Sequence, residues 1–142
     1  MTLDGALLWR LFYAGLLLAA SWVDLRERRI PNRFVVLGSL AALIHAALNN
    51  SLGTTIIGGL TGALLLVPFA LCGTLGMGDV KLALCIGLMV GWPAVIDALA
   101  LGAFVAAVVA GIGLLTRRWQ LQSGIPYGPF LVLGVLAVWV VR

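Results

Sequence analysis

The chain has 142 residues, of which 63% are hydrophobic and 10% are charged. Soluble globular domains carry a charge on about a quarter of their residues, so this composition excludes an ordinary soluble domain and indicates a membrane protein. The formal net charge of +4 does not indicate a nucleic-acid surface, because the basic residues cluster beside apolar runs, where they set topology and contact anionic lipid headgroups.

Apolar runs separated by charged or turn-forming residues predict six helices in a single domain that covers residues 1–142. We place these helices at 5–24, 33–49, 54–73, 79–92, 94–116 and 127–141. A helix needs roughly 20 residues to cross a bilayer, so about six short spans fill the chain. The fourth and sixth helices are short for a full span, and we expect them to be tilted or to begin inside the protein. The predicted fold is an all-α, polytopic membrane helical bundle.

The basic residues predict which connections face the cytoplasm. Seven of the nine Lys and Arg residues lie in or beside the connections after the first, third and fifth helices. These seven are Arg26, Arg28, Arg29, Arg33, Lys81, Arg117 and Arg118. Because Lys and Arg concentrate in cytoplasmic loops, we expect these three connections to be cytoplasmic and both chain termini to be extracytoplasmic.

Two acidic residues at the edges of apolar runs fall on that same side. Asp24 ends the first predicted helix, and Asp79 begins the fourth, where it is also a candidate N-cap. An acid at the edge of an apolar span is energetically costly and is by default a functional candidate. If the first and fourth helices pack together, the two carboxylates meet and share one proton, so that one activates a water and the other polarises a carbonyl. The pattern predicts an aspartyl dyad for peptide hydrolysis.

Small residues occur next to Asp79 and also within the predicted helices. Gly76 and Gly78 directly precede Asp79, and we expect them to permit unusual backbone angles and a close approach of substrate. Small residues spaced four apart also let membrane helices approach closely. Such pairs are Gly58 and Gly62, Gly87 and Gly91, and Ala103 and Ala107.

The segments around the two acids resemble the prepilin peptidases, which are type IV leader peptidases of the G-x-G-D membrane aspartyl protease class. The resemblance rests on residues 24–32 (DLRERRIPN) and 76–82 (GMGDVKL), and residues 125–131 (IPYGPFL) are similar to the segment before the family's last helix. It covers nearly the whole chain. It implies that Asp24 and Asp79 are the catalytic pair.

The resemblance also implies the substrate and the location. The expected substrate is a prepilin-like precursor with a short basic leader, cut after a Gly at the cytoplasmic boundary of the inner membrane. Larger members of the family add a tetracysteine loop that is associated with N-methylation of the new terminus. This chain has only Cys72 and Cys85, both in apolar stretches and expected to be buried, so we expect peptidase activity alone, without a metal or another cofactor.

Several roles stay open at this level. Lys81 is two residues beyond Asp79 and is expected to point away from it, as a topological Lys or as a residue that tunes the acids or holds substrate. Pro126, Gly128 and Pro129 either begin the sixth helix or shape the substrate groove.

Two other functional classes compete with the peptidase. One is a small ion- or proton-coupled transporter, but the middles of the helices offer few polar residues beyond Thr61 and His45. The other is a noncatalytic subunit of pilus assembly. The natural substrate, the pilus system and the oligomeric state do not follow from the sequence.

Overall fold

The computed structural model describes residues 3–27, 30–116 and 127–141. Within these ranges the chain forms six α-helices and no strand, which confirms the predicted all-α fold. The helices are α1 (Leu3–Glu27), α2 (Asn32–Leu48), α3 (Leu52–Leu71), α4 (Met77–Val90), α5 (Ala94–Leu115) and α6 (Gly128–Val141).

Two helix boundaries differ from the prediction in a way that matters for the acids. Because α1 continues to Glu27, Asp24 lies inside its last turns and not at its end. Because α4 begins at Met77, Asp79 lies in its first turn, after Gly76 as the N-cap residue. The fourth and sixth helices have 14 residues each, so both are as short as predicted.

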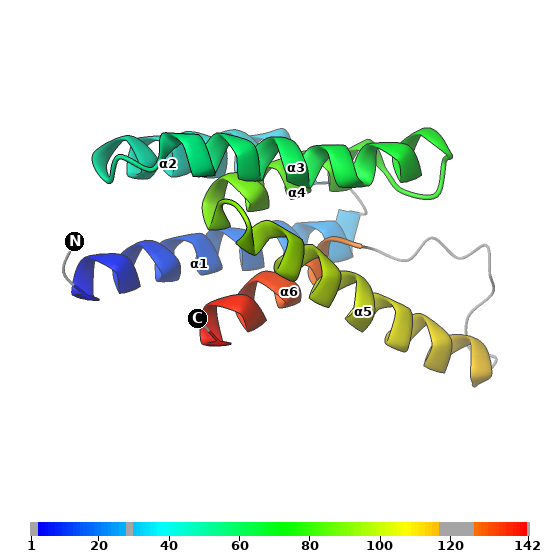
Figure 1. Ribbon diagram of the computed structural model, residues 1–142. Helices are drawn as coiled ribbons and strands as arrows, with labels where there is room; N and C mark the ends of the chain where they lie inside the picture. The colour runs from blue at the N-terminus through cyan, green and yellow to red at the C-terminus, as the bar shows by residue number, and fades with distance from the viewer. Residues whose placement is uncertain (1–2, 28–29, 117–126, 142) are drawn as a thin grey trace.

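The six helices alternate in direction along the bundle (Figure 1). In Figure 1, α2 and α3 lie side by side above α1, and α5 and α6 lie below, with both termini toward the same end. The closest helix pairs are α3 with α4 and α5 with α6, while α1 packs mainly against α6. The end of α1 and the beginnings of α2, α4 and α6 therefore gather at the other end of the bundle.

Glycines bring α3 and α4 into backbone contact, as their four-residue spacing predicts. A Cβ atom at Gly58 would lie 2.8 Å from Gly91 Cα, and one at Gly87 would overlap the Gly58 carbonyl oxygen. Gly62 faces the carbonyl oxygen of Ala83 in the same way. The predicted close helix packing is confirmed at this pair.

The small residues noted in α5, Ala103 and Ala107, do not contact another helix in this way. Both residues are exposed, so the close approach that their spacing permits is not used at this pair. The close contact between α5 and α6 instead uses Gly102 and Gly134, where a Cβ at Gly134 would lie 3.0 Å from Gly102 Cα. Four-residue spacing identifies a small face of a helix but does not say whether another helix covers it.

A buried apolar cluster joins the helices from inside, while large apolar side chains also cover the outside. Leu17, Ile86, Val95 and Leu131 belong to the cluster, which includes residues of α1, α4, α5 and α6. The outward apolar side chains include Phe104, which is 67% exposed. Three helices in the described part of the chain are long and apolar enough to cross a bilayer: Gly5–Glu27, Leu52–Leu71 and Ala94–Gly113. These features identify an integral membrane protein.

Candidate functional site

Asp24 and Asp79 line one cavity of about 280 Å³. The cavity lies where the end of α1 meets the beginnings of α2 and α4. Its other lining residues are Ile30, Asn32, Gly76, Gly78 and Lys81. Although the backbones of α1 and α4 share no extensive interface, the two acids reach the same space.

The position of Asp24 follows from the buried face of α1. Tyr13, Leu17, Ala20 and Asp24 recur at three- and four-residue intervals, so they form one stripe along the helix. All four are buried, and Asp24 is only 6% exposed. Its Oδ2 atom has no hydrogen-bond partner among the described residues. A buried carboxylate oxygen without a partner is costly, which is typical of a functional group.

The position of Asp79 follows from the start of α4. Asp79 is the third residue of the helix, and its Oδ2 atom accepts a hydrogen bond from the backbone N–H of Gly76 at 3.3 Å. The prediction that Asp79 is the N-cap residue is wrong by three positions, because the carboxylate reaches back to the N-terminal N–H group. The cavity-facing acid therefore also holds the first turn of its own helix.

The electrostatics of the cavity raise the pKa of Asp79, whose helix α4 is not one of the three candidate spans. Burial and then the nearby negative charge of Asp24 raise the pKa of Asp79 to about 6, against the opposing effect of the Gly76 N–H. Two carboxylates in one partly desolvated space do not ionise together easily. The pair can therefore hold one proton near neutral pH.

Gly76 and Gly78 contribute space and not unusual backbone angles. Gly76 has a φ of −77°, and the glycines with positive φ are Gly73 and Gly91 among the described residues. The prediction of unusual angles at Gly76 and Gly78 is wrong. A Cβ at Gly78 would approach Ile30 at 3.6 Å, which is an ordinary contact, so the missing side chains leave room in the cavity beside Asp79.

Lys81 lines the same cavity, contrary to the prediction that it points away from the acids. Its Nζ atom donates a hydrogen bond to Oδ1 of Asn32, the first residue of α2, at 3.2 Å. A lysine side chain is long enough to reach around the first turn of a helix, which the two-residue spacing does not reveal. The cavity thus carries one cation as well as two acids.

The beginning of α6 closes the site from another side. Gly128 is buried against Asp24, because a Cβ there would lie 2.6 Å from Asp24 Oδ2. Burial and the negative charge of Asp79 raise the pKa of Tyr127, so its phenol lies within electrostatic reach of that acid. Pro129 is half-buried in the first turn of α6, and Pro126 lies outside the described residues.

Tyr127 was not among the candidate site residues taken from the sequence. The available signal was its place inside residues 125–131, immediately before Gly128. Of the two cysteines, Cys85 is buried as predicted, whereas Cys72 is exposed, so that prediction is wrong. The described side chains include no group of three His, Cys, Asp or Glu that could hold a metal ion.

Known proteins match most of the chain. A family model described as the type IV leader peptidase family matches residues 11–114. The prepilin leader peptidase/N-methyltransferase of Aeromonas hydrophila is 33% identical over 87% of this chain and 46% of its own length. Its namesake from Aeromonas salmonicida strain A449 is 32% identical over 87% of this chain and 45% of its own length. The chain thus spans less than half the length of these curated relatives. No solved structure matches.

Proposed function

The chain belongs to the type IV leader peptidase family, and from this membership we propose that it is a membrane aspartyl endopeptidase. The proposed reaction removes the basic leader from type IV prepilin-like precursors at the cytoplasmic boundary of the membrane. The observation that carries the proposal is the shared cavity of about 280 Å³, which both Asp24 and Asp79 line and which has room for a water molecule.

The proposed chemistry needs the pair to hold one proton. The ionised carboxylate accepts a proton from a water whose oxygen attacks the scissile carbonyl carbon. The protonated carboxylic acid donates a hydrogen bond to the carbonyl oxygen and stabilises the charge that develops there. Breakdown of the tetrahedral intermediate breaks the C–N bond, and the departing amine takes a proton from the pair. The products are a leader that ends in a carboxylate and a pilin with a new amino terminus.

The surroundings of the acids support this reaction. The raised pKa of Asp79 supports a shared proton near neutral pH. The space left by Gly76 and Gly78 beside Asp79 suits an extended peptide, because a peptide bond inside a helix is shielded from attack. We assign substrate positioning, and not proton transfer, to Lys81 and to the start of α6 with Gly128 and Pro129.

The proposed location follows from the distribution of charge. Asp24 and Asp79 lie at the helix ends next to Arg26, Arg33 and Lys81, and we assign this end to the cytoplasm by the positive-inside rule. The exposed Arg26 and Arg33 are available to anionic headgroups. We propose that the single helical domain acts there on a precursor whose hydrophobic helix enters the same membrane.

The test is cleavage of a precursor that carries a basic leader ending in Gly, coexpressed with the full chain and followed by leader loss on a gel. Asp24→Asn and Asp79→Asn are each expected to abolish cleavage while the protein still accumulates in the membrane. Asp97→Asn is the matched control, because Asp97 lines a different cavity, and it is expected to cleave normally.

Either Asn variant with full cleavage would refute the assignment of the acids. Cleavage absent even with the unmodified chain, together with a proton flux in liposomes that lack any peptide, would favour the transporter. Loss of piliation without any effect on leader removal would favour a noncatalytic assembly subunit.

A further inference from the structure

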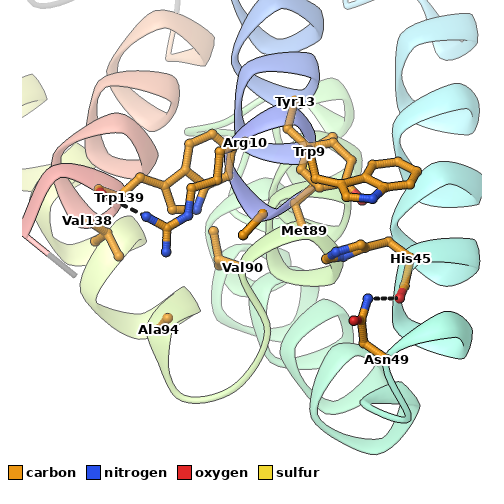
Figure 2. A pocket seen from close by; sticks show the side chains of 11 residues that line it. Trp9, Arg10, Tyr13, His45, Asn49, Met89, Val90, Ala94, Val138 and Trp139 are labelled. Carbon is orange, nitrogen blue, oxygen red and sulfur yellow. Dashed lines mark hydrogen bonds between the residues drawn. The ribbon is translucent and has the colours of Figure 1, made fainter. Parts of the chain in front are cut away.

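A second cavity, of about 440 Å³, lies at the end of the bundle opposite Asp24 and Asp79 (Figure 2). It is built from the start of α1, the ends of α2, α4 and α6 and the start of α5. Arg10, one of its lining residues, precedes Asp24 by 14 positions, which corresponds to about 21 Å along a helix axis. The cavity is therefore separate from the acid pair.

Aromatic rings form one wall of this cavity. Trp9 packs against His45 with ring centroids 4.8 Å apart and against Tyr13 at 5.8 Å. Trp139 stacks on Tyr13 at 6.3 Å from the other side. Trp and Tyr concentrate where a membrane protein crosses from the hydrocarbon to the headgroup layer. The wall thus has the composition of a membrane–water boundary.

Arg10 is the one charged residue among those that line the cavity. Its Nη1 atom donates to the backbone oxygen of Trp139 at 3.3 Å, as the dashed line in Figure 2 marks. This carbonyl is its one hydrogen-bond partner in the described part of the chain, and a guanidinium has five N–H donors. A cation in a candidate membrane span is costly unless an anion or several acceptors compensate it.

Two further polar atoms in the cavity wall lack partners. Tyr13 Oη and His45 Nε2 are buried without a hydrogen bond to any described residue, and Tyr13 is only 2% exposed. A buried hydroxyl without a partner costs roughly 1–3 kcal/mol, so such atoms normally meet a protein group, a water or a ligand. Because Tyr13 Oη is closed off from the open space, the polar groups that the cavity offers to a ligand are the free N–H donors of Arg10.

We propose that this cavity binds the phosphodiester headgroup of a membrane phospholipid. The Arg10 guanidinium pairs with the phosphate oxygens. Trp9 and Trp139 contact the glycerol region, and the acyl chains extend from there into the surrounding hydrocarbon. The positive charge of Arg10 excludes a quaternary ammonium group, which an aromatic wall alone would accept.

The probe is phosphatidylglycerol, added to the purified full chain in detergent and quantified as bound lipid by native mass spectrometry. Diacylglycerol is the matched lipid control, because it keeps the acyl chains and the glycerol but lacks the phosphate. The expected result is retention of phosphatidylglycerol and not of diacylglycerol, with inorganic phosphate unable to displace the lipid. Displacement by inorganic phosphate would overturn the lipid as the occupant. Tighter binding of phosphatidylcholine than of phosphatidylglycerol would overturn the role of Arg10.

Two variants of α1 locate the bound lipid. Arg10→Gln is expected to weaken phosphatidylglycerol binding about tenfold or more, since a charge-assisted pair is lost. Arg26→Gln removes the same charge from the other end of α1, where Arg26 is exposed over Trp22 and contacts headgroups only at the open, screened surface. This variant is therefore expected to change the retained phosphatidylglycerol less than about twofold. Equal effects of the two variants would refute the site.

Arg10→Lys covers the case in which Arg10→Gln does not fold. It keeps the positive charge but loses the planar fork of N–H donors, so phosphatidylglycerol binding is expected to weaken severalfold. Unchanged binding in Arg10→Lys would refute the pairing of the guanidinium with the phosphate. Asp24→Asn is expected to bind the lipid as the unmodified chain does, which separates this proposal from the proposed peptidase.

Discussion

The carboxylate of Asp24 occupies the space that a side chain at Gly128 would fill. A Cβ atom at residue 128 would lie 2.6 Å from Asp24 Oδ2 and 3.3 Å from Asp24 Cγ. The first residue of α6 thus fixes the position of an acid in the last turns of α1, although the two are far apart in sequence. The geometry of the acid pair therefore depends on how α6 packs on α1.

Gly128→Ala is expected to reduce precursor cleavage on the order of 100-fold, because the added methyl displaces the Asp24 carboxylate by a fraction of an ångström or more. Alanine is a better helix former than glycine, so α6 is expected to form and the protein to insert. The rate is measured with purified protein in lipid nanodiscs. Gly111→Ala in α5 is the control, because a Cβ there meets no atom within 4 Å. Equal rates for the two variants would contradict the steric role of Gly128.

The pH dependence of cleavage is expected to report the proton on the acid pair. The pKa of Asp79 is raised to about 6, so ionisation of this group removes the shared proton as the pH rises through that value. We expect kcat/KM to rise as the pH falls from about 8 toward about 6, with an apparent pKa near the upper value of the pair. Initial rates across this range in nanodiscs measure it. A rate that increases with pH throughout would rule out a singly protonated pair as the active form.

Asp79→Asn is expected to stabilise the protein at alkaline pH while it abolishes cleavage. A raised carboxyl pKa means that the folded state binds the proton more tightly than the unfolded state, so this stabilising effect is full below the ordinary value of 3.8 and is lost as the pH rises through about 6. Above that pH the native chain holds a buried anion beside Asp24. The neutral amide avoids this penalty, worth on the order of 1–2 kcal/mol, and can still accept the Gly76 N–H.

Thermal unfolding in detergent at several pH values measures this effect. The Asn variant is expected to melt above the unmodified protein at about pH 8, and the difference is expected to shrink through about pH 6 and to close toward about pH 4, where the acid is protonated in both states. A variant with a lower melting temperature at every pH value would show that the carboxylate stabilises the fold, in conflict with the electrostatics of the cavity.

Much of the fold and the family could be predicted from the sequence because each rests on a local pattern. Apolar runs interrupted by Asn49–Ser51 or Gly91–Pro93 turns locate the helices, and the alternation of six helices brings Asp24 and Asp79 to one end. The resemblance carried by residues 24–32 and 76–82 is confirmed at the level of the family. Neither the apolar runs nor the family resemblance requires knowledge of which helices are in contact.

The remaining parts depend on packing between distant helices, which local patterns do not encode. Ala103 and Gly134 are both small residues on apolar helices, yet only Gly134 meets another backbone. Lys81 enters the acid cavity because Asn32 of α2 lies within its reach, and Tyr127 nears Asp79 because α6 packs on α1. Each of these outcomes depends on a neighbour more than 30 positions away in the chain.

The contact between α3 and α4 is expected to tolerate no added methyl at Gly87. A Cβ there would overlap the carbonyl oxygen of Gly58, and backbone cannot move aside as a flexible side chain can. Gly87→Ala must therefore separate two helices whose contact is the closest in the bundle, at a cost of roughly 1–3 kcal/mol or more. We expect a lower melting temperature in detergent. Because Asp79 lies in the first turn of α4, we also expect a reduced cleavage rate in the fraction that remains folded.

Gly15→Ala provides the matched comparison for that variant. Gly15 lies inside α1, and a Cβ there meets no atom within 4 Å, so alanine adds helix propensity without a clash. Its expected effect is a stabilisation of about 0.5–1 kcal/mol. The opposite signs of the two substitutions distinguish glycines that permit close backbone packing from glycines that only weaken a helix. If Gly87→Ala were also stabilising, α3 and α4 would not be in the backbone contact on which the position of Asp79 depends.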